Sequence, residues 1–306
     1  MPETTTVKDD AVVERLRLAG YVLTRNEAAN VARAVDSLST VCDHVLVVDS
    51  ESADDTVAIA EKHGADVVIH HFAGFSAQRN FAIDHVEATY QPDYVLCLDA
   101  DEWLDDALIA DLRARIARGD LTEDAYLLHR QIRFDGRALR WGGFANTWLP
   151  RLFRPGTASY EDRVVNEHLS LVDGSTIGRL RGRLVNDDVI SWEDHIAKHN
   201  RYSTLEAQAR VALRRGEAQP TSLRDALRRP YLRRRWLRQN VWDRLPARPA
   251  IRFVQIYLLA GGLLDGRAGF RRALFEAWQE MCTDLKAEAQ RQTSQSDNPV
   301  TRRRQQ

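Results

Sequence analysis

The feature that most constrains this chain is the alternation of short apolar runs with helical patterns over its first hundred residues. The runs lie at 20–24, 44–49, 66–69 and 94–99, and the β-branched run at 44–49 is typical of a strand buried on both faces. Helical spacing of apolar residues follows the first three, at 31–38, 56–63 and 76–86. This order predicts parallel βαβ units, so we expect an α/β fold with a doubly wound, mostly parallel sheet.

The turn after the first run indicates where the next helix begins and which nucleotide-binding motifs are absent. Asn26 is the predicted N-cap of the helix that follows, and Gly64 suits the C-terminal cap of the next helix. The same turn carries no Gly-x-Gly-x-x-Gly, and the chain has no Gly-x-x-x-x-Gly-Lys-[Ser/Thr]. These absences argue against dinucleotide binding and P-loop chemistry.

Polar residues gather where the predicted strands end, which is where ligands bind in sheets of this kind. The group after the fourth strand, Asp99-Ala100-Asp101-Glu102, is the sharpest. Two carboxylates two residues apart suit Mg²⁺ or Mn²⁺, which keeps positions open for phosphate oxygens. The alternative is a surface loop whose acids cap the following helix.

Four ordered segments carry a family resemblance; they are 23–27, 47–56, 78–80 and 98–102. In these segments the chain resembles glycosyltransferase family 2, with the nucleotide-sugar-binding fold called GT-A. The nearest pattern is that of bacterial lipopolysaccharide-core and surface-polysaccharide glucosyltransferases. The match is strong over about the first 110 residues and weaker to about Arg272.

The resemblance implies a nucleotide pocket. Asp49 would hold the uracil or ribose of a nucleotide donor. Thr24, Asn26 and Glu27 would line the same pocket. A simpler interpretation of Glu27 is that it favours the first turn of its helix through the macrodipole.

The resemblance also implies a diphosphate and metal site. Arg79 and Asn80 would border the donor sugar or diphosphate. Asp99 and Asp101 would address the ribose and the metal-bound diphosphate. In the alternative interpretation, Asn80 only bonds backbone groups and Arg79 only pairs with an acid.

The middle of the chain is expected to supply the acceptor side and the base. Trp141, followed by two glycines, is a candidate platform for a sugar ring, whereas Leu152 and Phe153 are expected in the core. An inverting transferase needs a carboxylate to deprotonate the acceptor hydroxyl. Glu167 matches the family's glutamate and is the first candidate, with Asp162 as the second.

The stretch around Glu167 departs from the family pattern at one position. Asn166 stands where the family usually has His, and His168 follows Glu167 directly as a candidate acceptor-side substitute. Pairing of either acid with Arg163 or Arg151 is the structural alternative to a base.

Charge is distributed unevenly along the chain. Residues 1–110 hold 7 Lys and Arg against 21 Asp and Glu, whereas residues 210–252 hold 13 Arg against three acids. Arginine interleaved with Trp and Leu over 223–264 is typical of a membrane-surface helix, so an anionic membrane surface is the expected partner. Nucleic acid is the rejected rival, since no nucleic-acid module is recognised. An ordinary salt-bridged helix face is the third interpretation.

These patterns divide the chain into four parts: an N-terminal arm (1–18), a GT-A transferase domain (19–190), a helical basic extension (191–289) and a disordered tail (290–306). Three dispersed cysteines fit reduced thiols. No signal peptide or membrane-spanning run is recognised, so we expect a cytoplasmic protein, peripheral on the cytosolic face of the inner membrane.

The expected activity is hexosyl transfer from a nucleotide diphosphate sugar, UDP-linked by resemblance, to a lipid-anchored or cell-surface glycan. Mg²⁺ or Mn²⁺ would be the cofactor, and the transfer would invert the anomeric carbon. Two rivals stay open at this point. One is a nucleotidyltransferase that makes sugar nucleotides, which typically has a glycine-rich first loop. The other is a non-catalytic scaffold that keeps the fold.

Overall fold

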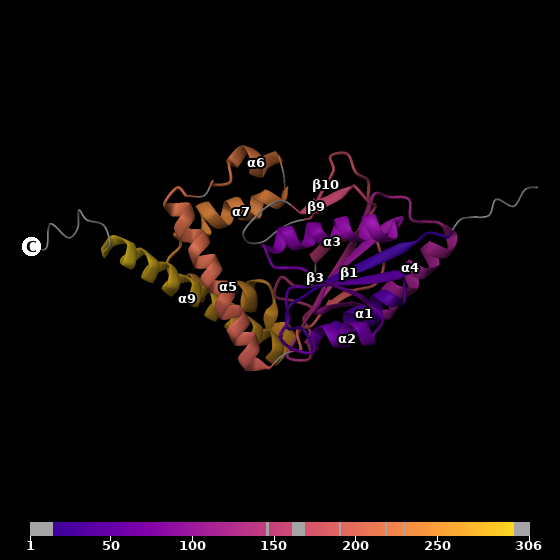
Figure 1. Ribbon diagram of the computed structural model, residues 1–306. Helices are drawn as coiled ribbons and strands as arrows, with labels where there is room; N and C mark the ends of the chain where they lie inside the picture. The colour runs from indigo at the N-terminus through magenta and orange to yellow at the C-terminus, as the bar shows by residue number, and fades with distance from the viewer. Residues whose placement is uncertain are drawn as a thin grey trace, which may run out of the picture. The chain divides into compact units, whose positions relative to one another are not determined.

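The protein divides into two compact units, shown in Figure 1. The sheet unit comprises residues 1–131 and 146–189, and the helical unit comprises 132–145 and 190–306. The computed structural model describes residues 15–144, 147–160, 169–189, 191–217, 219–228 and 230–296. Each unit is described below by itself.

Four parallel strands form the nucleus of the sheet unit, in the order β3-β2-β1-β4. They are β1 (Leu18–Thr24), β2 (His44–Asp49), β3 (Asp66–Ile69) and β4 (Tyr94–Asp99). The helices that connect and cover them are α1 (Val31–Ser39), α2 (Thr56–Lys62), α3 (Phe75–Tyr90) and α4 (Asp106–Arg118). The predicted doubly wound α/β sheet is therefore confirmed.

Beyond β4 the sheet continues through β8, β6, β12 and β5, mainly by antiparallel pairing. The strands are β5 (Glu102–Leu104), β6 (Ala125–Phe134), β8 (Thr147–Phe153) and β12 (Leu184–Asn186). Short β7 (Arg137–Ala138) and β11 (Ile177–Arg179) pair with β6, and β9 (Ala158–Tyr160) pairs with β10 (Leu169–Leu171). Leu152 and Phe153 of β8 are fully buried, as expected.

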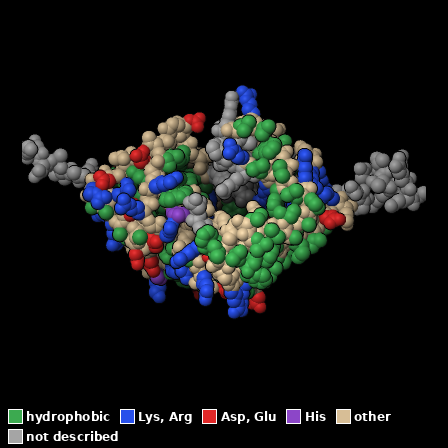
Figure 2. Space-filling view, turned by 180° about the vertical axis from the view of Figure 1, so that it is seen from behind, with side chains coloured by type: hydrophobic (Ala, Val, Ile, Leu, Met, Phe, Trp, Pro, Cys, Tyr) green, Lys and Arg blue, Asp and Glu red, His purple; other side chains and the backbone are tan. Residues whose placement is uncertain are grey.

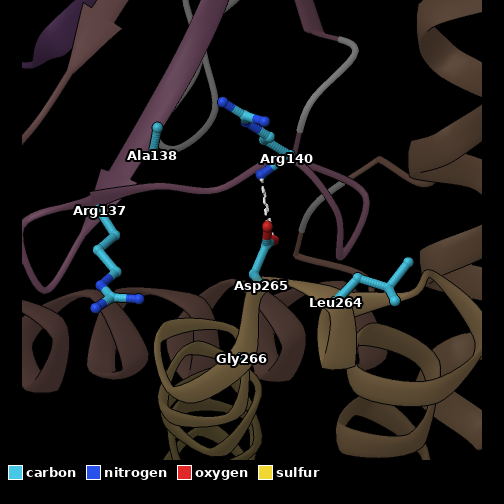
Figure 3. Close-up of a pocket in the computed structure, with 6 residues that line it drawn as sticks. All are labelled: Arg137, Ala138, Arg140, Leu264, Asp265 and Gly266. Atoms are coloured by element: carbon cyan, nitrogen blue, oxygen red, sulfur yellow. Dashed lines mark hydrogen bonds between the residues drawn. The ribbon is translucent and has the colours of Figure 1, made fainter.

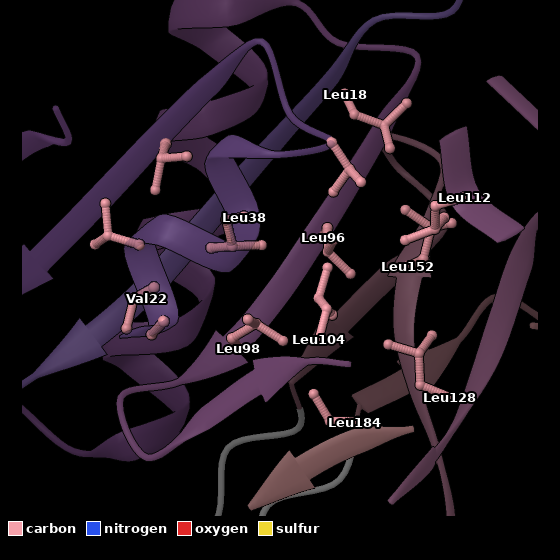
Figure 4. Packing of buried hydrophobic residues seen from close by; sticks show 14 of the residues in the cluster. Leu18, Val22, Leu38, Leu96, Leu98, Leu104, Leu112, Leu128, Leu152 and Leu184 are labelled. Carbon is pink, nitrogen blue, oxygen red and sulfur yellow. The ribbon is translucent and has the colours of Figure 1, made fainter. Parts of the chain in front are cut away.

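Alternating residues of each strand build two hydrophobic layers, because successive side chains point to opposite faces. Leu96 and Leu98 of β4 pack with α1 and α4 in one layer, part of which Figure 4 shows. Val95 and Cys97 pack with α3 in the other layer. Figure 1 shows α3 on one face of the sheet and α1, α2 and α4 on the other. Both faces are covered, which leaves the strand ends as the place for a ligand.

One predicted cap is wrong. α1 begins at Val31 with Asn30 as its N-cap residue, so Asn26 does not cap it. Asn26 instead adopts a left-handed conformation, with φ of 56°, which asparagine tolerates better than most residues. Gly64 follows the end of α2 with φ of 87°, as its predicted C-terminal role requires.

Apart from β7 and the end of β6, the described part of the helical unit consists of helices and short turns. They are α5 (Trp192–Arg214), α6 (Leu223–Arg228), α7 (Pro230–Asn240), η1 (Trp242–Arg244), α8 (Arg248–Val254), η2 (Gln255–Leu259), η3 (Gly262–Asp265) and α9 (Gly266–Ser296). Because α9 extends to Ser296, the segment expected to be disordered from residue 290 is helical up to that residue. None of the described helices is long and apolar enough to cross a bilayer.

A buried group of charges joins the helices of this unit, and we call it the helix cluster; its members are Arg210, Asp243, Arg248, Glu280 and Asp284. Arg210 of α5 donates to Glu280 at 2.6 Å and to Asp284 at 2.9 Å, both on α9. Arg248 of α8 donates to Asp284 and lies 3.3 Å from Asp243.

Some arginines of 210–252 have internal partners, as the salt-bridged interpretation left open by the sequence describes. Acids outside that window pair with them: Glu206 of α5 accepts from Arg238, and Glu276 of α9 accepts from Arg252 at 2.9 Å. The count of acids over 210–252 omitted Glu206 and Glu276 because both lie outside that window.

Candidate functional site

Asp49, the last residue of β2, is the centre of one group of polar residues at the strand ends. Thr24 of β1 donates its hydroxyl to Asp49 Oδ2 at 2.7 Å. Ser52 donates its backbone N–H to Oδ1 at 2.7 Å and its hydroxyl to Oδ2 at 2.6 Å. The Asp49 side chain is fully buried, so in this structure it fixes the turns after β1 and β2.

The same two turns are joined by further hydrogen bonds. The Asn26 N–H donates to the Ser52 hydroxyl at 2.8 Å, and the Asn26 side-chain oxygen accepts from the Ala53 N–H at 2.8 Å. The Glu27 N–H donates to the Thr56 hydroxyl at 2.8 Å. Sequence reasoning placed Asn26 and Glu27 in a nucleotide pocket. The structure places their backbones in the wall that joins the two loops.

A segment after β12 completes this wall, and the sequence gave no sign of it. Asn30 is fully buried and accepts from the Val189 N–H at 3.1 Å. The Asp187 N–H donates to the Asp101 carbonyl at 3.0 Å. Residues 187–189 therefore connect the start of α1, which is 159 residues away from Val189 in sequence, with the turn after β4.

The second group lies at the end of β4, and we call it the strand-edge cluster; its members are Arg79, Asp99, Glu102 and Arg151. Asp99 accepts from Arg79 of α3 on Oδ1 and from Arg151 of β8 on Oδ2, both at 2.7 Å. Arg151 also lies 2.8 Å from Glu102 Oε2 and 2.9 Å from Oε1. The cluster thus joins two carboxylates of the Asp-Ala-Asp-Glu motif to two arginines from separate elements.

The environment of the cluster gives its two acids different electrostatic properties. Burial alone would raise the pKa of Asp99, but Arg151 and Arg79 hold that pKa well below its usual range. Burial raises the pKa of Glu102 to about 7, with Arg151 opposing and Asp99 and Asp101 adding to the rise. Asp99 is therefore the charged acid of the pair at neutral pH.

Two nitrogen atoms of the strand-edge cluster are unsatisfied hydrogen-bond donors. Arg79 Nη1 and Arg151 Nε are buried without a hydrogen-bond partner among the described residues. A buried unsatisfied donor costs free energy, so such atoms call for an acceptor that the chain itself does not supply here. Phosphate oxygens are acceptors of the kind that arginine matches.

Asp101 differs from Asp99 because it lies beyond the end of the strand, although both residues are half-buried. No group of three or more His, Cys, Asp or Glu able to hold a metal occurs in the part of the chain that the structure describes. Mg²⁺ and Mn²⁺ need no such set, because one or two carboxylates can hold them together with substrate phosphates and water. The oxygen donors at the end of β4 therefore fit a divalent ion of this class.

The remaining predicted site residues lie in different places. Asn80 of α3 exchanges two hydrogen bonds with the Tyr160 backbone, at 2.9 and 2.8 Å, as its alternative structural interpretation describes. Trp141 belongs to the helical unit and is 48% exposed. Asp162, Glu167 and His168 lie outside the described residues, so their roles stay predictions.

Comparison with known proteins gives a consistent family match. The model of glycosyl transferase family 2 matches residues 21–179, just over half of the chain. An uncharacterized glycosyltransferase of Rickettsia conorii is 42% identical over 114 residues, which are 37% of this chain and 38% of that protein. The chain therefore matches well under half the length of that relative.

Two relatives match over more of the chain. The lipopolysaccharide core biosynthesis glycosyltransferase LpsC of Rhizobium meliloti is 27% identical over 206 residues, 65% of this chain and 74% of LpsC. A TPR repeat-containing protein of Synechococcus elongatus is 30% identical over 276 residues, 84% of this chain and 64% of that protein. Among solved structures, S. aureus TarS has a TM-score of 0.46 at 15% identity and covers 91% of this chain and 92% of its own.

Proposed function

The chain belongs to glycosyl transferase family 2, and from this premise we propose that it transfers a hexose from a nucleotide diphosphate sugar, UDP-linked, to a glycan acceptor. The observation that carries the proposal is the strand-edge cluster. It combines a charged Asp99 with two arginines that have unsatisfied donors at the carboxyl end of a parallel strand, and Asp101 lies just beyond that end. This is the edge of the GT-A sheet where a ligand is expected.

We assign the diphosphate to the arginine side of this edge. Arg79 and Arg151 are held in place by Asp99, so their free donor atoms are already oriented before a ligand arrives. Preorganised donors stabilise charge that develops on a leaving group without reorganising during the reaction. Here the leaving group is the nucleoside diphosphate.

We assign Mg²⁺ or Mn²⁺ to Asp101, with Asp99, the last residue of β4, as the second carboxylate. Asp99 already accepts from two arginines, whereas Asp101 lies two residues beyond the end of the strand that carries Asp99. A bound divalent ion would act as a Lewis acid on the diphosphate oxygens. The chain's own contribution is to hold the Asp101 backbone through its carbonyl bond to Asp187.

The nucleoside part of the donor is assigned to the wall between the turns after β1 and β2. Thr24, Asn26 and Glu27 form this wall. Asp49 holds it in place by accepting hydrogen bonds from Thr24 and Ser52. A carboxylate that removes the acceptor proton would give inversion at the anomeric carbon. Glu167, with Asp162 second, is the proposed base.

The acceptor is proposed to be lipid-anchored or part of a cell-surface glycan. The name of LpsC, a lipopolysaccharide core enzyme, supports this class of acceptor by similarity alone. Such an acceptor would bring the chain to the cytosolic face of a membrane, so an anionic membrane surface is a proposed partner. Trp141, exposed in the helical unit, and His168 stay candidates for the acceptor side.

Donor hydrolysis with and without Mn²⁺ tests the proposal. Release of UDP from a UDP-sugar, dependent on Mn²⁺, is the expected result. Release of pyrophosphate would instead indicate a nucleotidyltransferase, and release of neither would indicate a scaffold. The proposed base is tested in the same assay by Glu167→Gln and Asp162→Asn. Whichever of the two variants removes the base should lose about a hundredfold or more of the UDP release but keep UDP binding.

A further inference from the structure

Four leucines stand out on the surface of the helical unit, in the short turns between α8 and α9. Leu259 is 81% exposed, the highest value among its large hydrophobic residues that the structure describes. Leu264, Leu258 and Leu263 are 60%, 52% and 45% exposed. We call these four residues the leucine tip. A group of exposed leucines this close in sequence is unusual on a surface that meets only water.

The backbone of the leucine tip is well held, so the exposure is built into the fold. Gly261 adopts φ of 75°, and a Cβ on Gly262 would lie 2.7 Å from the Ile256 carbonyl oxygen. The Gly142 N–H donates to the Ala260 carbonyl at 2.9 Å. Only glycine fits the close approach at 262, which places leucines on both sides of a tight turn.

Further apolar side chains extend the same surface. Gly261 lies beside Trp141, since a Cβ there would be 3.3 Å from the indole ring. Phe270 is 43% exposed and contacts the Tyr257 ring edge-on, with ring centroids 5.5 Å apart. Figure 2 shows hydrophobic side chains gathered on the surface that it displays, with Lys and Arg around them. The contacts of Gly261 and Tyr257 place Trp141 and Phe270 beside the leucine tip, and we call this apolar surface the patch.

Arginines border the patch on the side of β7. Arg137 and Arg140 line a cavity of about 450 Å³ with Leu264, Asp265 and Gly266, shown in Figure 3. Both arginines are exposed, as is Arg267. Asp265 is the acid of this cavity, and its carboxylate already accepts from the N–H groups of Arg140 and Trp141, at 3.0 and 2.9 Å. The rim of the patch therefore carries an excess of positive charge.

We propose that the leucine tip inserts into the headgroup region of an anionic bilayer, while Arg137 and Arg140 receive lipid phosphates at its edge. Exposed leucine and tryptophan beside arginine are the combination that binds a membrane from one side. Arginine near an anionic surface adds attraction that acts over about a Debye length, roughly 10 Å at 0.1 M salt. A second copy of the chain would cover the leucines but would not use the arginine rim.

This inference names the surface that would bring the chain to a lipid-anchored acceptor. It rests on the proposed function only because that function gives the chain a reason to bind a membrane. It also narrows the segment responsible. The sequence predicted a membrane-surface segment over 223–264, and several of its arginines pair with acids of the same unit, such as Arg238 with Glu206. The leucine tip lies at the C-terminal end of that segment and depends on few charges.

Vesicle flotation of the full chain, without donor or acceptor, tests the proposal. The vesicles are phosphatidylcholine alone or with phosphatidylglycerol, across a salt series. The tip variant is Leu259→Ser with Leu263→Ser, and the rim variant is Arg137→Gln with Arg140→Gln. The matched control is Leu285→Ser, an equally exposed leucine (59%) about 22 Å further along α9 than Phe270.

We expect the tip variant to lower vesicle binding at least about tenfold, because apolar burial is lost on both vesicle types. The rim variant should lose the preference for phosphatidylglycerol and most of the salt dependence. Leu285→Ser should bind like the wild type. Unchanged melting temperatures will show that each variant folds.

Three results would overturn the proposal: a wild-type chain that floats with neither vesicle, a tip variant that binds like the wild type, or a Leu285→Ser variant that loses as much binding as the tip variant. A wild-type dimer in sedimentation velocity that the tip variant makes monomeric, with no flotation, would assign the patch to a second copy. Because no donor is present, each of these results leaves UDP-sugar hydrolysis to be judged separately.

Discussion

The strand-edge cluster and the helix cluster are chemically alike and differ in what surrounds them. Each buries arginines against carboxylates from distant parts of the chain. In the helix cluster Arg210 reaches three acids, and the group joins α5, η1, α8 and α9. The strand-edge cluster lies at the end of a parallel strand beside Asp101, and its Asp99 side chain is 33% exposed.

The difference teaches that a buried ion pair alone does not mark a functional site. Replacing such pairs by apolar residues is often neutral, whereas removing one partner leaves a buried charge that is costly. What distinguishes the strand-edge cluster is its position, where ligands reach an α/β sheet. Substitutions should therefore separate the clusters: one should affect mainly stability, the other mainly turnover.

The largest expected effect is on the stability of the helical unit. Arg210→Met leaves Glu280 without its 2.6 Å partner, so the free energy of unfolding should fall by about 3–5 kcal/mol. Chemical denaturation measures this change, and UDP release per folded molecule should stay unchanged. Arg215→Met is the control, because Arg215 is exposed and lies 3.8 Å from Glu217; it should cost less than about 1 kcal/mol. Equal losses for the two variants would mean that the helix cluster does not hold the unit together.

The next effect is on turnover at the strand edge. Asp101→Asn should lower Mn²⁺-dependent UDP release on the order of a hundredfold, because a metal ligand is lost while the size of the side chain is kept. Its melting temperature should stay close to that of the wild type. Asp106→Asn removes an exposed acid from the first turn of α4 and should keep nearly full activity. A fully active Asp101→Asn at limiting Mn²⁺ would contradict the metal assignment.

The smallest effect concerns pH and the helical unit. Burial lowers the pKa of His199 to about 4, with His195 and Arg272 adding to the fall and Gln279 and Glu276 opposing it. An unfolded histidine binds its proton near pH 6.5, so below that pH the unfolded state takes up more protons than the folded state. The stability due to neutral His199 is thus present above pH 6.5 and is lost as the pH falls toward 4.

His199→Gln should therefore make the melting temperature less sensitive to pH between about 6.5 and 4, by a few degrees. Thermal melts across this range measure the slope. His71→Gln is the control, because the His71 side chain is 80% exposed. If both variants keep the wild-type slope, another group controls the acid sensitivity.

Local sequence patterns predicted the sheet unit well and its contacts less well. The four strands and the acids that follow them were recognisable because the alternation of strand and helix follows from residue type and spacing. The pairing of Arg151 with Asp99 could not be recognised from the sequence, since 52 residues separate them and no local pattern connects them. Two acids of the helix cluster, Glu280 and Asp284, escaped for the same reason, because they lie 70 and 74 residues from Arg210 along the chain.

Asn26 and the leucine tip show two other limits of the sequence. Asparagine suits both an N-cap and a left-handed turn, so residue type could not decide between them. Leu258 to Leu264 lie in the segment 223–264 that the sequence assigned to a membrane-surface helix, but the turn at Gly261 and Gly262, which exposes the four leucines, was not recognised. The role of the stretch around Glu167 stays a prediction from the resemblance.

Calorimetric titration with UDP, with and without Mn²⁺, tests the central claim most directly, because it compares the two clusters in one binding reaction. The wild-type chain and Arg210→Met, measured well below its melting temperature, should both bind UDP more tightly when Mn²⁺ is present. Asp101→Asn should lose that Mn²⁺-dependent gain. The account is contradicted if Asp101→Asn keeps the gain, or if the wild-type chain binds no UDP under either condition.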